Sequence, residues 1–253
     1  MREELAKIIR ENIHLLREPT LDNFYANIPK WSRGEVTQAL LQMGIDPLSR
    51  VKDIPDCLYY KMAGVSSINI PDNVNYIRSS AFANMTDLES VTIPKNIMSI
   101  DDNAFSDCEK LSSIKFSFPG KLTYIGHNAF AKTAVEKIVI PCSVSAIGSG
   151  AFYWCRNLKE AIIMEGVDTI GQMTFVECRN LSYLSLPRTI RSIEMYAFQC
   201  CNALDKIYYS GTKDEFESIM QKFSRNWAYQ SALDKIICYD GVIDLDSRLK
   251  ITV

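Results

Sequence analysis

Apolar residues recur along this chain at intervals of about 23 residues, the usual spacing between successive Ala-Phe or Thr-Phe pairs. A leucine follows the phenylalanine by six residues in most copies, and Val135 stands at five in one shortened copy. A unit this short cannot bury its own apolar face, so it must stack on neighbours of the same shape. The phenylalanines that mark the copies are Phe82, Phe105, Phe130, Phe152, Phe175 and Phe198.

Each copy contains a strand-like run in which side chains alternate in character, as in Val91-Thr92-Ile93, and several runs end at a proline. Alternation with a period of two points strand side chains to opposite faces. Two aliphatic residues three positions apart follow each run, which predicts a second, shorter extended segment. An earlier half-copy without a phenylalanine begins at Ser67. We number it as the first coil, so that Phe82 opens the second.

This frame resembles the BspA-like leucine-rich repeats of bacterial, phage and some protist proteins, through its strand-proline, Ile-Gly and Ala-Phe elements. The resemblance covers about residues 64–241 and implies a leucine-rich-repeat solenoid, mainly β, with short parallel strands and turns. We place the repeat array at residues 61–209. Two copies depart from the frame: the third coil carries an insertion at Ser117-Phe118, and the fifth has Met164 where others have proline. These departures affect the local strand register and leave the predicted fold unchanged.

Residues 1–60 follow a helical pattern instead. Leucine and isoleucine recur at helical spacing before residue 17, which predicts an amphipathic helix. Ser32 and Glu35 form a capping box that opens a second helix, and Gly44 is placed to end it. We predict an α-helical N-terminal module that caps the first coil, because repeat arrays need polar-faced ends. A separate helical module with its own partner is the alternative.

Residues 210–253 are predicted to form an α/β cap at the other end. Thr212 and Glu215 make a second capping box, which predicts a helix of about ten residues. Asp240-Gly241 predicts the tight turn of a hairpin. This segment, which includes Trp227, resembles the terminal segment of BspA-like arrays, and the resemblance implies that it closes the solenoid.

The formal net charge is −2, and the basic residues are scattered over the chain. Nucleic acids and acidic membrane surfaces are therefore not expected as partners. The chain has no run of about 18 apolar residues, and charged residues interrupt its first positions, so neither a membrane span nor a secretory signal is predicted. We accordingly expect a cytoplasmic protein, and the sequence supports no prediction of its oligomeric state.

Residues that carry most enzyme chemistry are scarce. His14 and His127 are the two histidines, and neither lies in a Ser-His-Asp or Cys-His pattern. Several cysteines lie three residues after a repeat phenylalanine, where Met85 and Thr133 stand in other copies. Because methionine and threonine also occupy this position, we interpret it as a packing position for a buried side chain and not as a metal ligand or a disulfide partner. We predict no enzyme activity, no cofactor and no metal. These cysteines are Cys108, Cys155, Cys178 and Cys201.

The outward strand positions change character along the array. In the first coils they are small and polar, as at Ser67 and Thr92, whereas aliphatic and aromatic residues stand there in the later coils. Aromatic residues carry much of the energy of protein interfaces. We therefore predict a protein partner on the later coils, with two lysines at the margin. The residues predicted to hold it are Tyr183, Tyr208, Ile162 and Val139, with Lys115 and Lys137 at the margin.

Tyr153 and Trp154 form a competing anchor, because the other copies lack a pair of aromatic residues directly after the phenylalanine. The alternative is that one of these rings folds onto a neighbouring coil.

The function favoured by these observations is a non-enzymatic protein-binding module that uses the exposed solenoid surface. One alternative is a phage or mobile-element inhibitor that blocks a host defence protein inside a bacterium. Another is a surface adhesin, which the resemblance implies for secreted members and which would need a signal peptide absent from this sequence. An enzyme with a site between the helical module and the solenoid is a further alternative, which the scarcity of histidine disfavours.

Overall fold

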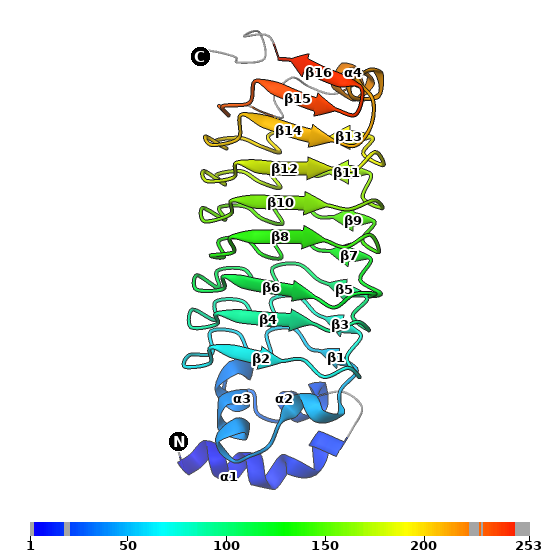
Figure 1. Ribbon diagram of the computed structural model, residues 1–253. Coiled ribbons are helices and arrows are strands. Elements are labelled where there is room, and N and C mark those ends of the chain that lie inside the picture. Colours follow the sequence, from blue (N-terminus) through cyan, green and yellow to red (C-terminus); the bar gives the residue numbers. More distant parts are fainter. Residues whose placement is uncertain (1–2, 18–20, 223–227, 229, 246–253) are drawn as a thin grey trace.

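The computed structural model describes residues 3–17, 21–222, 228 and 230–245. Within these residues the chain forms an elongated stack of coils, with helices at its N-terminal end and a helix and a hairpin at the other end (Figure 1). The leucine-rich-repeat solenoid predicted from the sequence is thus confirmed.

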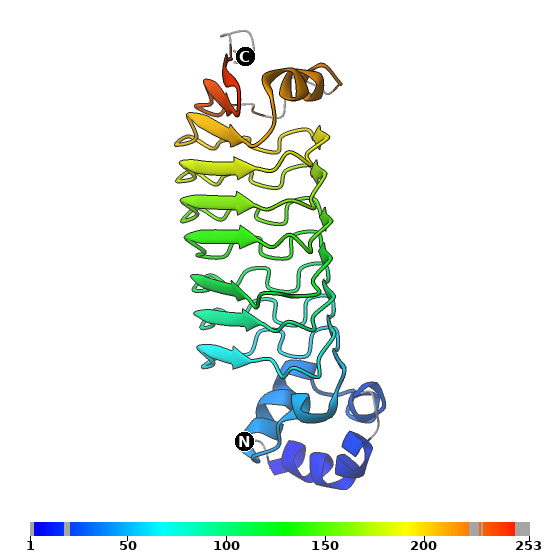
Figure 2. The same ribbon diagram turned by 45° about the vertical axis from the view of Figure 1, so that its right-hand side comes forward.

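Each coil contributes one long strand and one short strand, and the two sets run up different sides of the stack (Figure 2). The long strands are β2 (Ser67–Asn69), β4 (Ser90–Ile93), β6 (Ser113–Phe116), β8 (Lys137–Ile140), β10 (Glu160–Ile163), β12 (Tyr183–Leu186) and β14 (Lys206–Tyr209). The short strands are β1 (Asp53–Ile54), β3 (Tyr76–Ile77), β5 (Ser99–Ile100), β7 (Tyr124–Ile125), β9 (Ala146–Ile147), β11 (Thr169–Ile170) and β13 (Ser192–Ile193).

The long strands form the surface that we call the main sheet. It consists of two hydrogen-bonded segments of parallel strands, β2-β4-β6 and β8-β10-β12-β14. The second segment continues into β15 (Lys235–Cys238) and the antiparallel β16 (Gly241–Asp244). In β4 and β8 the first and third side chains are exposed and the second and fourth are buried. This alternation separates a core face from an outer face of the main sheet.

Stacked aromatic rings run through the core along the whole array. Each repeat phenylalanine is fully buried, and neighbouring ring centroids lie between 4.9 and 5.8 Å apart. Tyr59 continues the series, because its ring stacks on Phe82 with centroids 5.1 Å apart. The half-copy therefore has an aromatic ring of its own, and the coil geometry begins within the range assigned to the helical module.

The backbone around each ring adopts the left-handed conformation at two places, two residues before and two residues after the ring. At Asn103 and Asp107, which flank Phe105, φ is 57° and 60°, and the same pair of positive φ angles recurs in every coil. Every second N–H group of this stretch points to the next coil, as when Phe105 donates to the carbonyl oxygen of Ala129 at 2.8 Å. The arc between the short and long strands is thereby hydrogen-bonded from coil to coil.

The cysteine positions are buried as predicted, and each also makes a hydrogen bond. The thiols of Cys108 and Cys178 donate to the carbonyl oxygens of Phe82 and Phe152 of the preceding coil, with Sγ–O distances of 3.1 and 3.2 Å. Cys155 and Cys201 repeat the contact. A small side chain with a donor therefore fits this place better than an alkyl group of the same size.

The N-terminal helices are α1 (Glu3–Asn12), a 3-10 turn (Ile13–Arg17), α2 (Asp22–Ala26), α3 (Arg33–Gln42) and a second 3-10 turn (Pro47–Arg50). Ser32 caps α3 with the predicted reciprocal bonds to Glu35. The helix lies against the first coil, since a Cβ atom on Gly34 would collide with the carbonyl oxygen of Tyr60 and the Thr37 hydroxyl donates to Leu58 at 2.9 Å. These contacts are those expected of a cap.

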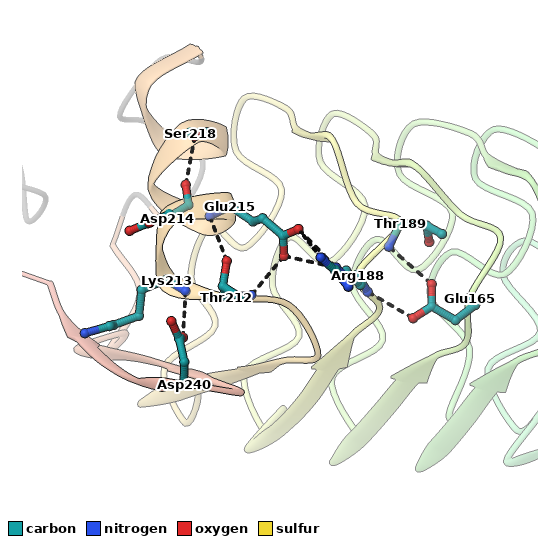
Figure 3. Close-up of polar contacts among 9 residues, drawn as sticks. All are labelled: Glu165, Arg188, Thr189, Thr212, Lys213, Asp214, Glu215, Ser218 and Asp240. Carbon is teal, nitrogen blue, oxygen red and sulfur yellow. Dashed lines mark hydrogen bonds and ion pairs between the residues drawn. The ribbon is translucent and has the colours of Figure 1, made fainter.

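The C-terminal helix α4 (Lys213–Lys222) begins at the predicted capping box, in which Thr212 donates its backbone N–H to Glu215 Oε2 at 2.9 Å. Figure 3 shows Arg188 joining this helix to the solenoid: its guanidinium donates to Glu215 at 2.7 Å, and its backbone N–H donates to Glu165 of the preceding coil at 3.2 Å. Arg188 thus joins α4 to the last coils of the solenoid by hydrogen bonds.

The hairpin after α4 differs from its prediction by one residue. Cys238 pairs with Gly241, so the loop consists of Tyr239 and Asp240 rather than Asp240-Gly241. The carboxylate of Asp240 accepts the backbone N–H of Lys213 at the start of α4, at 2.8 Å (Figure 3). This tie fixes Asp240 in the loop. Trp227, which the sequence assigned to the same cap, lies outside the described residues.

Candidate partner-binding surface

The outward residues of the later coils form two continuous columns on the main sheet. One column pairs Lys137 with Glu160 and Glu160 with Tyr183. The other joins Val139, Ile162, Ser185 and Tyr208 in register. The parallel strands therefore bring the predicted apolar residues onto one face, in adjacent coils.

The two tyrosines form the most extended apolar feature of these columns. The rings of Tyr183 and Tyr208 stack with centroids 4.8 Å apart and an angle of 28° between their planes. Tyr183 is 38% exposed, as is Val139, while Tyr208 and Ile162 are half-buried. Each ring restrains the other on a rigid sheet. We call the four residues Val139, Ile162, Tyr183 and Tyr208 the outer-face patch.

The two lysines at the margin differ from each other in their contacts. Lys137 Nζ pairs with Glu160 Oε1 at 2.9 Å, so its charge is balanced within its own column. Lys115 is exposed on β6 and makes no ion pair in the part of the chain that the structure describes. The two side chains are therefore not equivalent as ligands for an acidic group.

A cleft of about 750 Å³ opens beside the outer-face patch, between β6 and β8. Three of the residues predicted from the sequence line this cleft, namely Lys115, Lys137 and Val139, but the cleft itself was not predicted. The signal was present in the chain as the insertion at Ser117-Phe118 and the shortened copy that follows it. The cleft walls carry Ile114, Phe116, Phe118, Pro141 and Met164 beside Val139, with Lys115, Lys137, Glu136, Ser112 and Ser113.

Tyr153 and Trp154 lie outside the main sheet, in the arc that joins β9 to β10. Their rings stack with centroids 5.9 Å apart, and the guanidinium of Arg156 lies 4.2 Å from the Trp154 ring centroid. Trp154 is 37% exposed and occupies a left-handed position with φ of 60°. The structure therefore does not bring this pair together with the outer-face patch.

The groups that could carry catalysis are dispersed. His127 Nδ1 accepts the backbone N–H of Ser149 at 2.9 Å, which occupies that nitrogen. Burial raises the pKa of the Cys155 thiol to about 11 and that of Cys108 to about 12, so both remain protonated near neutral pH. Among the described residues, no group of three His, Cys, Asp or Glu side chains is placed to hold a metal ion. Within the same residues every helix is too short or too polar to span a bilayer.

The stacked coils and the repeat frame agree with a known family. Residues 44–159 and 145–237 match the BspA-type leucine-rich repeat region, with six copies. The chain belongs to the BspA-type leucine-rich repeat family. Leucine-rich-repeat solenoids are typically non-enzymatic and generally mediate interactions between proteins.

Solved structures of leucine-rich repeat proteins resemble this BspA-type chain. One from Bacteroides ovatus is 26% identical with a TM-score of 0.59, and the match covers 73% of this chain and 46% of that one. The chain thus spans less than half of the Bacteroides protein. The pneumococcal vaccine antigen PcpA is 20% identical with a TM-score of 0.43, covering 75% and 60% of the two chains. The T. pallidum leucine-rich repeat protein is 23% identical with a TM-score of 0.43, covering 68% and 86%. No curated protein matches the sequence.

Proposed function

We propose that this chain is a non-enzymatic protein-binding module that holds its partner on the outer-face patch. The stacked pair of Tyr183 and Tyr208 is the observation that carries the proposal. Tyrosine presents a large apolar ring with a polar tip and few rotatable bonds, so it loses little conformational entropy when it is covered. Two such rings already stacked on a rigid sheet are pre-organised for an interface.

The aliphatic side chains extend the same surface toward the middle of the solenoid. Ile162 lies in register between Val139 and Ser185, so the patch runs across four neighbouring strands. Hot spots in protein interfaces cluster in this way, with polar residues around them that exclude water. The ion pair of Lys137 and Glu160 supplies such a polar border.

The intracellular inhibitor of a host protein and the surface adhesin are two settings for the same module. Both need a contiguous exposed patch, and the outer-face patch would serve either one. Identifying the captured partner would distinguish these two settings.

Affinity capture from the native cell with variants of the full chain tests the proposal. We expect Tyr183→Ala with Tyr208→Ala to weaken partner binding by at least about 30-fold, because truncating a hot-spot side chain costs about 2 kcal/mol or more. The matched control is Tyr153→Ala with Trp154→Ala, which removes another stacked aromatic pair from a different face. Binding that survives loss of Tyr183 and Tyr208 but is lost in this control, or on deletion of residues 1–60, contradicts the proposal.

A further inference from the structure

The main sheet is interrupted at one junction, between β6 and β8. Every other pair of neighbouring long strands is joined by a parallel ladder, whereas in the described part of the chain β6 and β8 belong to separate hydrogen-bonded segments. Figure 1 shows the two strands following each other in the stack at this place. The cleft of about 750 Å³ lies at this junction.

Two changes of length in the repeat explain the interruption. The turn after β6 carries extra residues, because Leu122 follows Ser113 at a greater distance than Ile97 follows Ser90. The turn before β8 is shorter, because Val135 stands five residues after its phenylalanine instead of six. Both changes of length fall at the junction where β6 and β8 belong to separate hydrogen-bonded segments.

The interruption leaves backbone groups that face the cleft without a strand partner. On a central parallel strand, successive residues direct their N–H and C=O groups to opposite neighbours. Ser117 bonds back to Ile93 of β4 at 2.9 Å, so Phe116 directs its backbone groups toward β8. By the same alternation Val139 directs its groups toward β6. Both strands therefore offer hydrogen-bonding edges to an occupant of the cleft.

The side chains around these edges combine apolar surface with one unbalanced charge. Phe118 in the inserted turn is 70% exposed, and Met164, which also lines the cleft, is 39% exposed. The charges of Glu136 and Lys137 are balanced by Lys159 and Glu160, each at 2.9 Å. Lys115 is the cation on the cleft wall that forms no ion pair with any described residue.

We propose that the cleft between β6 and β8 receives an extended segment of the partner protein, which inserts a large apolar side chain and places a carboxylate against Lys115. This proposal rests on the proposed function and specifies the chemistry of the partner. The apolar walls favour the apolar side chain, and the ammonium group of Lys115 favours the acid. Val139 belongs to both the cleft and the outer-face patch, so one partner covers them together.

Strands β6 and β8 lie too close together for a strand of the partner to fit between them, so only a side chain can enter the cleft. Cα atoms of β6 and β8 still approach within 8 Å of each other. Inserting a strand between them would require about 9.5 Å, twice the usual separation of paired strands. The segment therefore lies across the mouth of the cleft with its apolar side chain directed inward.

A displayed library of random heptapeptides, panned on the full chain, tests this proposal. We expect the enriched peptides to carry a large apolar residue with Asp or Glu within two positions. The consensus peptide should lose about tenfold in affinity on Lys115→Ala, or when its acid is replaced by the amide, because a charge-assisted hydrogen bond is lost; tenfold corresponds to about 1.4 kcal/mol. Lys110→Ala, which removes an exposed lysine that pairs with Asp87 and does not line the cleft, should leave the affinity unchanged.

Filling the cleft provides a second measurement with a matched control. Ser113→Trp places a ring on the cleft wall and should abolish peptide binding. Ser90→Trp makes the same change one coil earlier, on a strand whose ladder is intact, and should not. Panning that enriches no acidic apolar peptide, or a consensus peptide that binds the Ser113→Trp variant normally, overturns the cleft proposal. Loss of partner capture on Tyr183→Ala with Tyr208→Ala in that case leaves the proposed function standing.

Discussion

The early and later halves of the solenoid are alike inside and different outside. Phe82 and Phe175 occupy the same fully buried ladder, and Cys108 and Cys201 donate the same hydrogen bond to the coil before them. On the outer face, small polar side chains such as Ser90 in the early coils give way to the outer-face patch in the later ones. Stacking restricts the interior of every coil, whereas the outward positions of the main sheet face solvent and lie outside the core.

The difference separates residues that maintain the array from residues that serve its partner. An inward substitution should affect both halves equally, because each coil contacts only its neighbours and uses the same packing. An outward substitution should matter for binding in the later half alone. Substitutions at buried and at exposed positions of the same region of the array test this separation.

The largest effect is expected for Phe152→Ala. Removing a fully buried ring from the ladder should lower the free energy of unfolding by about 3 to 5 kcal/mol, as large-to-small core replacements do. Urea unfolding measures it, with Tyr153→Ala as the neighbouring control on the half-buried side of the arc. Equal stability losses in the two variants would mean that the inside and outside of the coil are not energetically distinct.

The ladder of stacked phenylalanine rings could be predicted because the same residue types recur at a fixed spacing in every copy. The capping boxes of Ser32 and Thr212 were equally readable, since both partners of each box lie within four residues. The first ring was missed because Tyr59 replaces phenylalanine there. Its spacing of 23 residues from Phe82 was the signal that could have found it.

The cleft could not be predicted from the same pattern. The insertion at Ser117-Phe118 and the missing residue before Val135 were each visible as a local change of length. Their combined effect, the loss of hydrogen bonds between β6 and β8, depends on how two turns displace two strands in space. The balance of charge at Lys137 likewise depends on Glu160, which lies in the next coil.

A smaller effect is expected at the cysteine position. Cys178→Ala removes the thiol that donates to Phe152 and leaves a small cavity, which should lower the free energy of unfolding by about 1 to 2 kcal/mol. Thermal and urea unfolding measure the change. Cys142→Ala is the control, because that cysteine is exposed and its loss should change stability by less than about 0.5 kcal/mol. A Cys178→Ala variant as stable as the parent would show that the hydrogen bond contributes nothing.

The smallest effect is expected for Lys137→Ala. The ion pair with Glu160 is largely exposed, and exposed pairs contribute about 0.2 to 1 kcal/mol. Its loss should become smaller still at high salt, because screening weakens the pair in the parent. Denaturation at two salt concentrations measures this. A loss comparable to that of Phe152→Ala would place the outward column among the residues that maintain the fold.

The most direct test of the central claim is photo-crosslinking from matched outward positions. Ser185 lies in register between Ile162 and Tyr208, and the exposed Asn69 occupies the same column in the first coil, two strands before Lys115. A benzophenone amino acid introduced at either place leaves the anchoring tyrosines intact. We expect irradiation of the captured complex to give a partner adduct from position 185 and none from position 69. Adducts of equal yield from both positions, or an adduct from position 69 alone, would contradict the claim that the later coils hold the partner.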